Sequence, residues 1–162
     1  MIAKNLPLEL PKRLFKSLVP RVSPYIWTES DHPLPFLKYL CEIHPLDINS
    51  HGGYALTRAV HASHIPLIQF LLAHGADPSR KDNIAINVAI RRKDISLVRL
   101  LIEPGKEDKN KNKKRKVMDR IQTTKEMLKM AVKCDARDIV DYFLREKRVV
   151  PDMQTVRMMT PY

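Results

Sequence analysis

The sequence of 162 residues has little glycine, little cysteine and few aromatic residues. Four glycines and an aromatic fraction of 6% favour helices over a β-sandwich. No apolar run approaches the roughly 18 residues that a membrane-spanning helix needs, so we expect no transmembrane segment. The hydrophobic fraction of 44% is nevertheless enough to bury a core, which argues against disorder of the whole chain.

The chain has only two cysteines, Cys41 and Cys134, and they lie far apart in the sequence. Its first 20 residues interrupt their apolar positions with charges and prolines, which is not the pattern of a secretory signal peptide. We therefore expect reduced thiols in a cytosolic or nuclear protein.

Catalytic and metal-binding motifs are missing as well. The sequence contains no Gly-x-Ser-x-Gly motif, no glycine-rich phosphate loop and no Cys-x-x-Cys pair. Three of its six histidines, His61, His64 and His74, lie near one another in the sequence but lack the spacing of a zinc site. We expect no catalytic residue, no cofactor and no metal, and a structural role for His64.

Acidic residues are scarce relative to basic ones. The chain has 29 Lys and Arg against 18 Asp and Glu, a net charge of +11. Such an excess predicts an acidic counterpart, which can be nucleic acid, an acidic protein or an anionic membrane surface.

What the sequence does contain is a repeated pattern that starts at three alanines, Ala59, Ala89 and Ala131. Eight and nine residues after each alanine comes an apolar pair, and eleven to thirteen residues after it comes an apolar triplet. The pairs are Leu67/Ile68, Leu97/Val98 and Ile139/Val140, and the triplets are Phe70–Leu72, Leu100–Ile102 and Tyr142–Leu144. Three stretches that keep one pattern predict a repeated unit of two helices.

The stretch Gly53–Asn83 resembles an ankyrin repeat, with a matching second helix and a Gly75-Ala76-Asp77 turn. A more divergent unit, Leu34–Gly53, precedes it, with a second helix expected over Phe36–Glu42. The family's Thr-Pro-Leu-His tetrapeptide is replaced, for example by Tyr54-Ala55-Leu56-Thr57. The resemblance implies an all-α ankyrin-repeat solenoid of about three to four helix-turn-helix units with helical caps at both ends.

These assignments divide the chain into three parts. Residues 1–33 are expected to form an N-terminal helical cap, with a helix that starts near Pro11 and has on its apolar side Leu10, Leu14, Phe15, Leu18 and Val19. Residues 34–150 are expected to form the array, with a basic insertion at 105–120. Residues 151–162 are expected to form a C-terminal cap or tail, in which Asp152 caps a short helix.

The resemblance also implies a function, because ankyrin arrays bind other proteins on a concave face lined by first helices and finger tips. In the register above, basic side chains gather at these positions. We therefore expect a non-catalytic module that binds an acidic segment of a partner protein. The residues expected on the concave face and the finger tips are His61, Arg80, Lys81, Asp82, Arg91, Arg92, Lys93, Lys129 and Lys133. The alternative is that these residues are ordinary exposed polar positions without a binding role.

The insertion Gly105–Arg120 holds eight basic residues and three acidic ones. Four of the basic residues are consecutive, namely Lys113, Lys114, Arg115 and Lys116. Such a run suggests a nuclear import signal, and hence a nuclear rather than a cytoplasmic protein. One alternative is an electrostatic factor that contacts nucleic-acid phosphates in chromatin or a ribonucleoprotein. The other is a plain solvated loop.

A third functional hypothesis concerns the N-terminus. Asn5–Leu18 faintly resembles the start of an F-box, which would make the chain a ubiquitin-ligase adaptor that binds through Leu6, Pro7 and Leu10. An F-box needs about three helices, and the prolines of this stretch leave little room for them.

Overall fold

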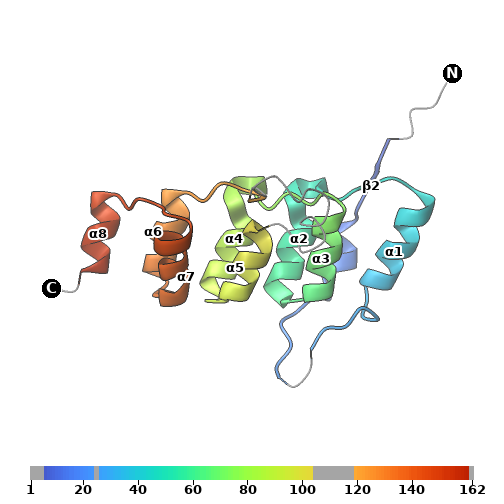
Figure 1. Ribbon diagram of the computed structural model, residues 1–162. Coiled ribbons are helices and arrows are strands. Elements are labelled where there is room, and N and C mark those ends of the chain that lie inside the picture. Colours follow the sequence, from blue (N-terminus) through green and yellow to red (C-terminus); the bar gives the residue numbers. More distant parts are fainter. Residues whose placement is uncertain (1–5, 24–25, 104–118, 161–162) are drawn as a thin grey trace, which may run out of the picture. The chain divides into compact units, whose positions relative to one another are not determined.

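The computed structural model describes residues 6–23, 26–103 and 119–160 (Figure 1). The chain divides into two compact units, Met1–Asp82 and Asn83–Tyr162. Among the described residues, no helix is both long and apolar enough to cross a membrane.

The N-terminal unit contains three α-helices and a short strand pair. Strand β1 (Leu8–Glu9) runs parallel to β2 (Leu46–Asp47), and Leu8 lies opposite Leu46. Between the strands come the 3₁₀-helix η1 (Lys12–Phe15) and helix α1 (Leu34–Ile43). Helices α2 (Ser50–Ala62) and α3 (Ile65–Ala73) follow and pack on each other.

The C-terminal unit is helical throughout its described residues. Helix α4 (Arg80–Arg91) begins in the last residues of the N-terminal unit and is followed by α5 (Ile95–Ile102). After the insertion come α6 (Lys125–Lys133) and α7 (Arg137–Asp141), which continues as the π-helix η3 (Tyr142–Glu146). The last helix is α8 (Met153–Met159).

The three alanines of the repeat occupy equivalent places in α2, α4 and α6. Ala59, Ala89 and Ala131 are fully buried. Each backbone carbonyl accepts a hydrogen bond from the N–H of the N-cap residue, which directly precedes the second helix, with N–O distances of 3.0, 3.3 and 3.0 Å. The donors are His64, Asp94 and Ala136. The predicted register therefore holds in the backbone.

The turn between the two helices of each unit also repeats. It contains one left-handed residue, which is Ser63, Lys93 or Asp135, with φ between 51° and 55°. His64 then caps α3, because its Nδ1 accepts a hydrogen bond from the Leu67 N–H at 3.2 Å. His64 thus has the structural role that the sequence predicts.

The N-terminal segment differs from the expected helical cap. Leu10, Phe15 and Leu18 are buried as expected. However, the four residues of η1 are the only helical ones in the described range 6–23, and Val19, expected on the apolar side of a helix, is 56% exposed. Pro11 is the residue directly before η1. The side chain of Arg58 in α2 donates hydrogen bonds to the backbone carbonyls of Phe15 and Leu18, at 3.3 and 2.5 Å. These bonds hold the segment in an extended path on α2. The described residues 6–23 thus form a short strand and a single turn of helix, which gives the F-box hypothesis no support.

The strand pair was not predicted, since two residues per strand leave no alternating pattern to read. At the other end, α8 begins as predicted, because the Asp152 side chain accepts a hydrogen bond from the Thr155 N–H at 2.7 Å. This backbone hydrogen bond is the main reason that the pKa of Asp152 is lowered. Thr155 is the only buried residue of α8, and Met153 is 72% exposed.

Candidate partner-binding surface

Helices α4 and α6 carry the repeat alanines Ala89 and Ala131 and are first helices of the two-helix units in the C-terminal unit. Thr124 caps α6 through the Met127 N–H, and Asp152 caps α8 through the Thr155 N–H, with the same pattern of hydrogen bond. Nζ of Lys129 on α6 donates to Oε1 of Gln154 on α8 at 2.6 Å, so these two helices are neighbours. Helix α8 therefore lies beside the first helix α6.

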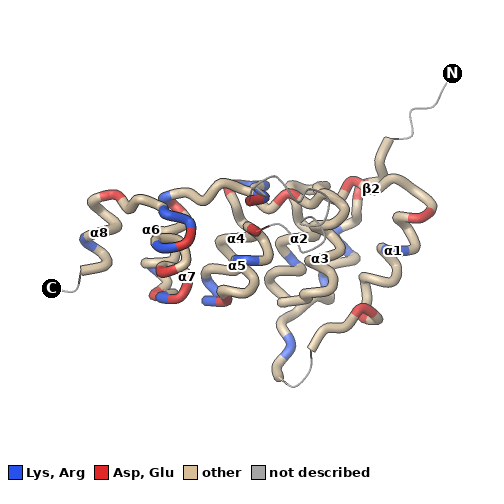
Figure 2. Tube along the Cα trace, in the orientation of Figure 1, with Lys and Arg blue, Asp and Glu red and all other residues tan. Residues whose placement is uncertain are grey.

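This register gives the basic residues of the three helices a common orientation. Arg91 near the end of α4 corresponds to Lys133 at the end of α6, and Lys129 of α6 corresponds to Arg157 of α8. Figure 2 marks basic residues on these helices. We call Arg91, Lys129, Lys133 and Arg157 the first-helix face. Three of the four are exposed, and Lys129 is half-buried.

Two basic residues on the second-helix side of the same unit, Arg99 and Lys147, are neutralised. Arg99 of α5 pairs with Glu103 at 3.2 Å, and its Nη1 donates to Oε2 of Glu146 at 2.7 Å. Glu146 raises the pKa of Arg99, chiefly through this hydrogen bond, and Arg99 lowers the pKa of Glu146. Lys147 pairs with Asp119 at 2.8 Å.

The first-helix face differs in this respect. Within the described residues, Arg91, Lys133 and Arg157 form no ion pair. Charged groups without a partner keep their full attraction for an anion, subject to screening by salt. The face therefore carries positive charge that no ion pair of the described residues compensates.

The other predicted residues fall in several places. Arg92 and Lys93 are exposed at the end of α4, and Lys93 is the left-handed residue of its turn. His61, Arg80, Lys81 and Asp82 are exposed and belong to the N-terminal unit. The predicted set is thus divided between the two units.

The last of these residues form a finger tip. Lys81 and Asp82 have φ of 49° and 54°, and together with Asn83 they repeat the left-handed turn of His51–Gly53 at an offset of 30 residues. Nε of Arg80 pairs with Oδ2 of Asp77 at 3.5 Å, which leaves this cation less available to a ligand than Arg91.

The basic run Lys113–Lys116 lies outside the described residues. The last residues of the insertion contact the chain that precedes it, because the Arg120 N–H donates to the Ile102 carbonyl at 2.7 Å. Lys147 lies 3.7 Å from Glu103, before the insertion, and 2.8 Å from Asp119, near its end.

Residues suited to other chemistry are sparse. In the described ranges, no three His, Cys, Asp or Glu residues are grouped so that they could hold a metal ion. Cys41 and Cys134 are partly exposed and unpaired, and burial raises the pKa of the Cys41 thiol, which disfavours a reactive thiolate.

Arg157 was not among the predicted site residues. The signal for it is present in the sequence, since Asp152 stands 28 residues after Thr124 and both are helix-capping residues. The same offset places Arg157 in the register of Lys129.

These helix-turn-helix units with left-handed turns are typical of a repeat protein. A family model described as ankyrin repeats (many copies) matches residues 56–102. This part of the chain thus matches ankyrin repeats, which confirms the resemblance seen in the sequence. No curated protein and no solved structure matches the chain.

Proposed function

We propose that this chain is a non-catalytic protein-binding module that holds an acidic segment of its partner on the first-helix face. Ankyrin repeats indicate protein–protein interaction. The observation that supports an acidic partner is the contrast in ion pairing. Arg99 of α5 and Lys147, which follows η3, are neutralised, whereas Arg91, Lys133 and Arg157 are exposed without an ion pair among the described residues.

The charge distribution between the units favours the C-terminal one. The N-terminal unit has nine basic and seven acidic residues, a net charge of +2, and the C-terminal unit has twenty and eleven, a net charge of +9. The insertion 105–120 contributes eight basic and three acidic residues to this excess, and the remaining twelve and eight leave +4 for the rest of the unit. Anionic partners are therefore attracted mainly to the C-terminal unit.

The test is binding of a fluorescent peptide rich in Glu and Asp, followed by anisotropy at several salt concentrations. Reversing the charges of Arg91, Lys133 and Arg157 to Glu should weaken binding at least about tenfold, since each lost contact to a charged group is worth roughly 1 kcal/mol or more. A matched control is Arg145→Glu, which reverses an exposed cation on η3, where Arg145 lies 3.9 Å from Asp141.

A second variant separates this function from the nucleic-acid alternative. Neutralising Lys109, Lys111 and the run 113–116 should leave peptide binding almost unchanged. If peptide binding is lost in this variant but survives the triple reversal, the proposal is wrong. Tight oligonucleotide binding near physiological salt that depends on the same lysines would favour the nucleic-acid role instead.

We also propose that the protein enters the nucleus by means of Lys113–Lys116, since such a basic run fits acidic import-receptor grooves. A fusion to a fluorescent protein too large to diffuse through nuclear pores should accumulate in the nucleus and lose this accumulation when the run is changed to alanine. Alanine at Lys106, Lys109 and Lys111 is the control. Nuclear accumulation without the run would overturn the assignment.

A further inference from the structure

The unpaired cations of the first-helix face stand on three helices that follow one another within the C-terminal unit. The pair α4–α5 stacks on the pair α6–α7, because α5 contacts α7 and Arg99 of α5 binds Glu146 of η3. Helix α8 contacts α6, and the order α4, α6, α8 is visible in Figure 1. Packed helices lie about 8–10 Å apart, so each step to the next helix moves a cation by about this distance.

The positions of these cations along their helices are also set. Arg91 and Lys133 each lie two residues after a buried repeat alanine whose carbonyl makes the same backbone hydrogen bond, so they occupy equivalent places on α4 and α6. Arg157 follows Gln154 by three residues, and Gln154 accepts a hydrogen bond from Lys129, one turn before Lys133. We call Arg91, Lys133 and Arg157 the cation row.

The other lysines of α6 are less available than the cation row. The pKa of Asp152 is lowered first by its hydrogen bond from Thr155 and also by the charges of Lys129 and Lys125. These two lysines therefore lie close enough to the Asp152 carboxylate to be partly compensated by it. Lys133 has no such neighbour among the ion pairs of the described residues.

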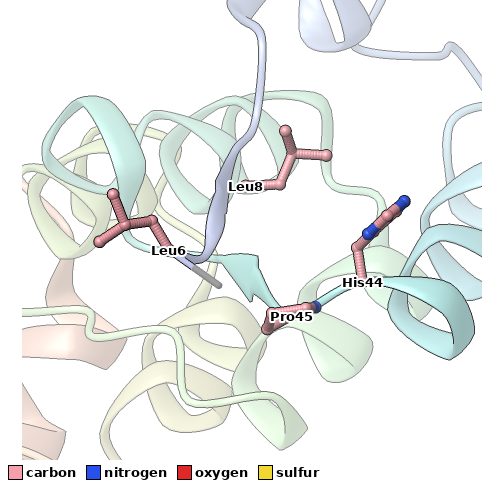
Figure 3. Close-up of a pocket in the computed structure, with 4 residues that line it drawn as sticks. All are labelled: Leu6, Leu8, His44 and Pro45. Carbon is pink, nitrogen blue, oxygen red and sulfur yellow. The ribbon is translucent and has the colours of Figure 1, made fainter. Parts of the chain in front are cut away.

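The hollow of the N-terminal unit is of a different chemical kind. Its lining residues, Leu6, Leu8, His44 and Pro45, include neither lysine nor arginine (Figure 3). An acidic segment gains no ion pair with a lysine or arginine there, so the cation row is the better site for it.

Given the acidic partner proposed above, we propose that the bound segment is extended in the polyproline II conformation and carries an acidic residue at every third position. This conformation has three residues per turn and rises about 3.1 Å per residue, so every third side chain lies on one face at intervals of about 9 Å. The interval matches the separation of neighbouring packed helices. One carboxylate then meets Arg91, the next meets Lys133 and the third meets Arg157.

Other conformations fit the cation row less well. In a β-strand, side chains three residues apart point to opposite faces. An α-helix rises only about 1.5 Å per residue, so the same row would need a helix of about 15 residues. Like charges one turn apart destabilise such a helix, whereas their repulsion keeps a short acidic segment extended.

The first experiment compares fluorescent peptides that all contain three Glu and four Pro and differ only in order. One peptide has Glu at every third position, one has Glu at every second position, and one has the three Glu in succession. The first peptide should bind at least about fivefold more tightly than either of the others, since each misplaced carboxylate loses a contact to a charged group. Reversing the three charges of the cation row should abolish this preference.

Two kinds of failure are distinguishable in this comparison. Equal affinities, or tighter binding of the peptide with successive Glu, would overturn the proposed spacing while leaving an acidic partner in place. Absence of binding for these peptides and for a long peptide rich in Glu and Asp would overturn both the spacing and the proposed function.

The order of contacts has its own test in double-mutant cycles. Each Glu of the spaced peptide is changed to Gln and combined with Arg91→Gln, Lys133→Gln or Arg157→Gln. The middle Glu should couple to Lys133, and each end Glu should couple to only one of the two arginines. Arg145→Gln is the matched control and should couple to none of them. Equal coupling of every Glu to every cation of the row would contradict a segment held in a single register.

Discussion

Gly53 closes the left-handed turn at the start of α2, with φ of 77°. It is buried, and a Cβ built there would lie 3.2 Å from Cβ of Arg80. Gly75, with φ of 86°, would meet no atom within 4 Å. Gly75→Ala should therefore lower the free energy of unfolding by about 1–2 kcal/mol, the cost of a left-handed conformation at a residue with a Cβ. Gly53→Ala should lower it more, because the added Cβ would also crowd Arg80. Urea unfolding followed by fluorescence of Trp27, the single tryptophan, measures both. Equal losses would contradict the close approach at Gly53.

His64 should make the N-terminal unit sensitive to acid. Burial is the main cause that lowers the pKa of His64, while the charge of Asp31 opposes this shift. A lowered pKa in the folded state means that the unfolded chain takes up the proton first. The contribution of His64 to the free energy of unfolding is thus fully present above about pH 6.5, the pKa of a histidine in the unfolded chain, and is lost as the pH falls below that value.

The measurement is the free energy of unfolding between about pH 5 and pH 8, on either side of the histidine pKa. His64→Leu should be less stable at neutral pH, because the hydrogen bond from Leu67 is lost, yet its stability should vary less with pH. The ring also stacks on Trp27, with centroids 4.6 Å apart, so tryptophan fluorescence follows the same site. An unchanged pH dependence in the variant would mean that another group is responsible.

At the scale of the helices, Tyr142 links α5 to the segment that follows α7. Its ring is buried, and its hydroxyl donates to Oε1 of Glu103 at 3.1 Å. Burial raises its pKa far above the usual value for tyrosine, so the hydroxyl stays protonated and remains a donor. Tyr142→Phe should lower the free energy of unfolding by about 0.5–1.5 kcal/mol, the usual worth of one hydrogen bond.

Thermal or urea unfolding of the C-terminal unit, followed by circular dichroism, measures this loss. Tyr54→Phe is the matched control, because Tyr54 is half-buried against Phe15 in the other unit and no hydrogen bond of its hydroxyl is recorded among the described residues. If both substitutions cost the same, the bond to Glu103 contributes nothing specific.

The helices themselves were predictable to different degrees. The helix expected over Phe36–Glu42 and the capped helix after Asp152 are present as α1 and α8, because capping and apolar spacing act over short distances. The predicted helix near Pro11 is reduced to η1, because Arg58, 40 residues away from Leu18, binds the carbonyls of this segment. No local pattern reveals so distant a hydrogen bond.

For the whole molecule, the first-helix face and His64 lie in different units and should act independently. His64→Leu should bind the acidic peptide with the same Kd as the natural sequence, at a temperature where the variant is folded. The triple reversal of Arg91, Lys133 and Arg157 should keep the pH dependence of unfolding that His64 causes. Measuring both properties on both variants tests this separation, and a loss of peptide binding in folded His64→Leu would show that the two units are coupled.

The sequence by itself determined the repeat register. Only one register places the small residues where helices cross and at the same time buries the apolar pairs that follow at fixed offsets. It also placed the basic residues on the first helices and identified His64 as structural. Which cations are neutralised was decided only in three dimensions. Arg99 meets Glu146 and Lys147 meets Asp119 because the fold brings side chains 47 and 28 residues apart within hydrogen-bonding distance. The fold also left Phe36, Tyr39 and Ile43 of α1 exposed, since exposure depends on what packs against a helix and not on its own sequence.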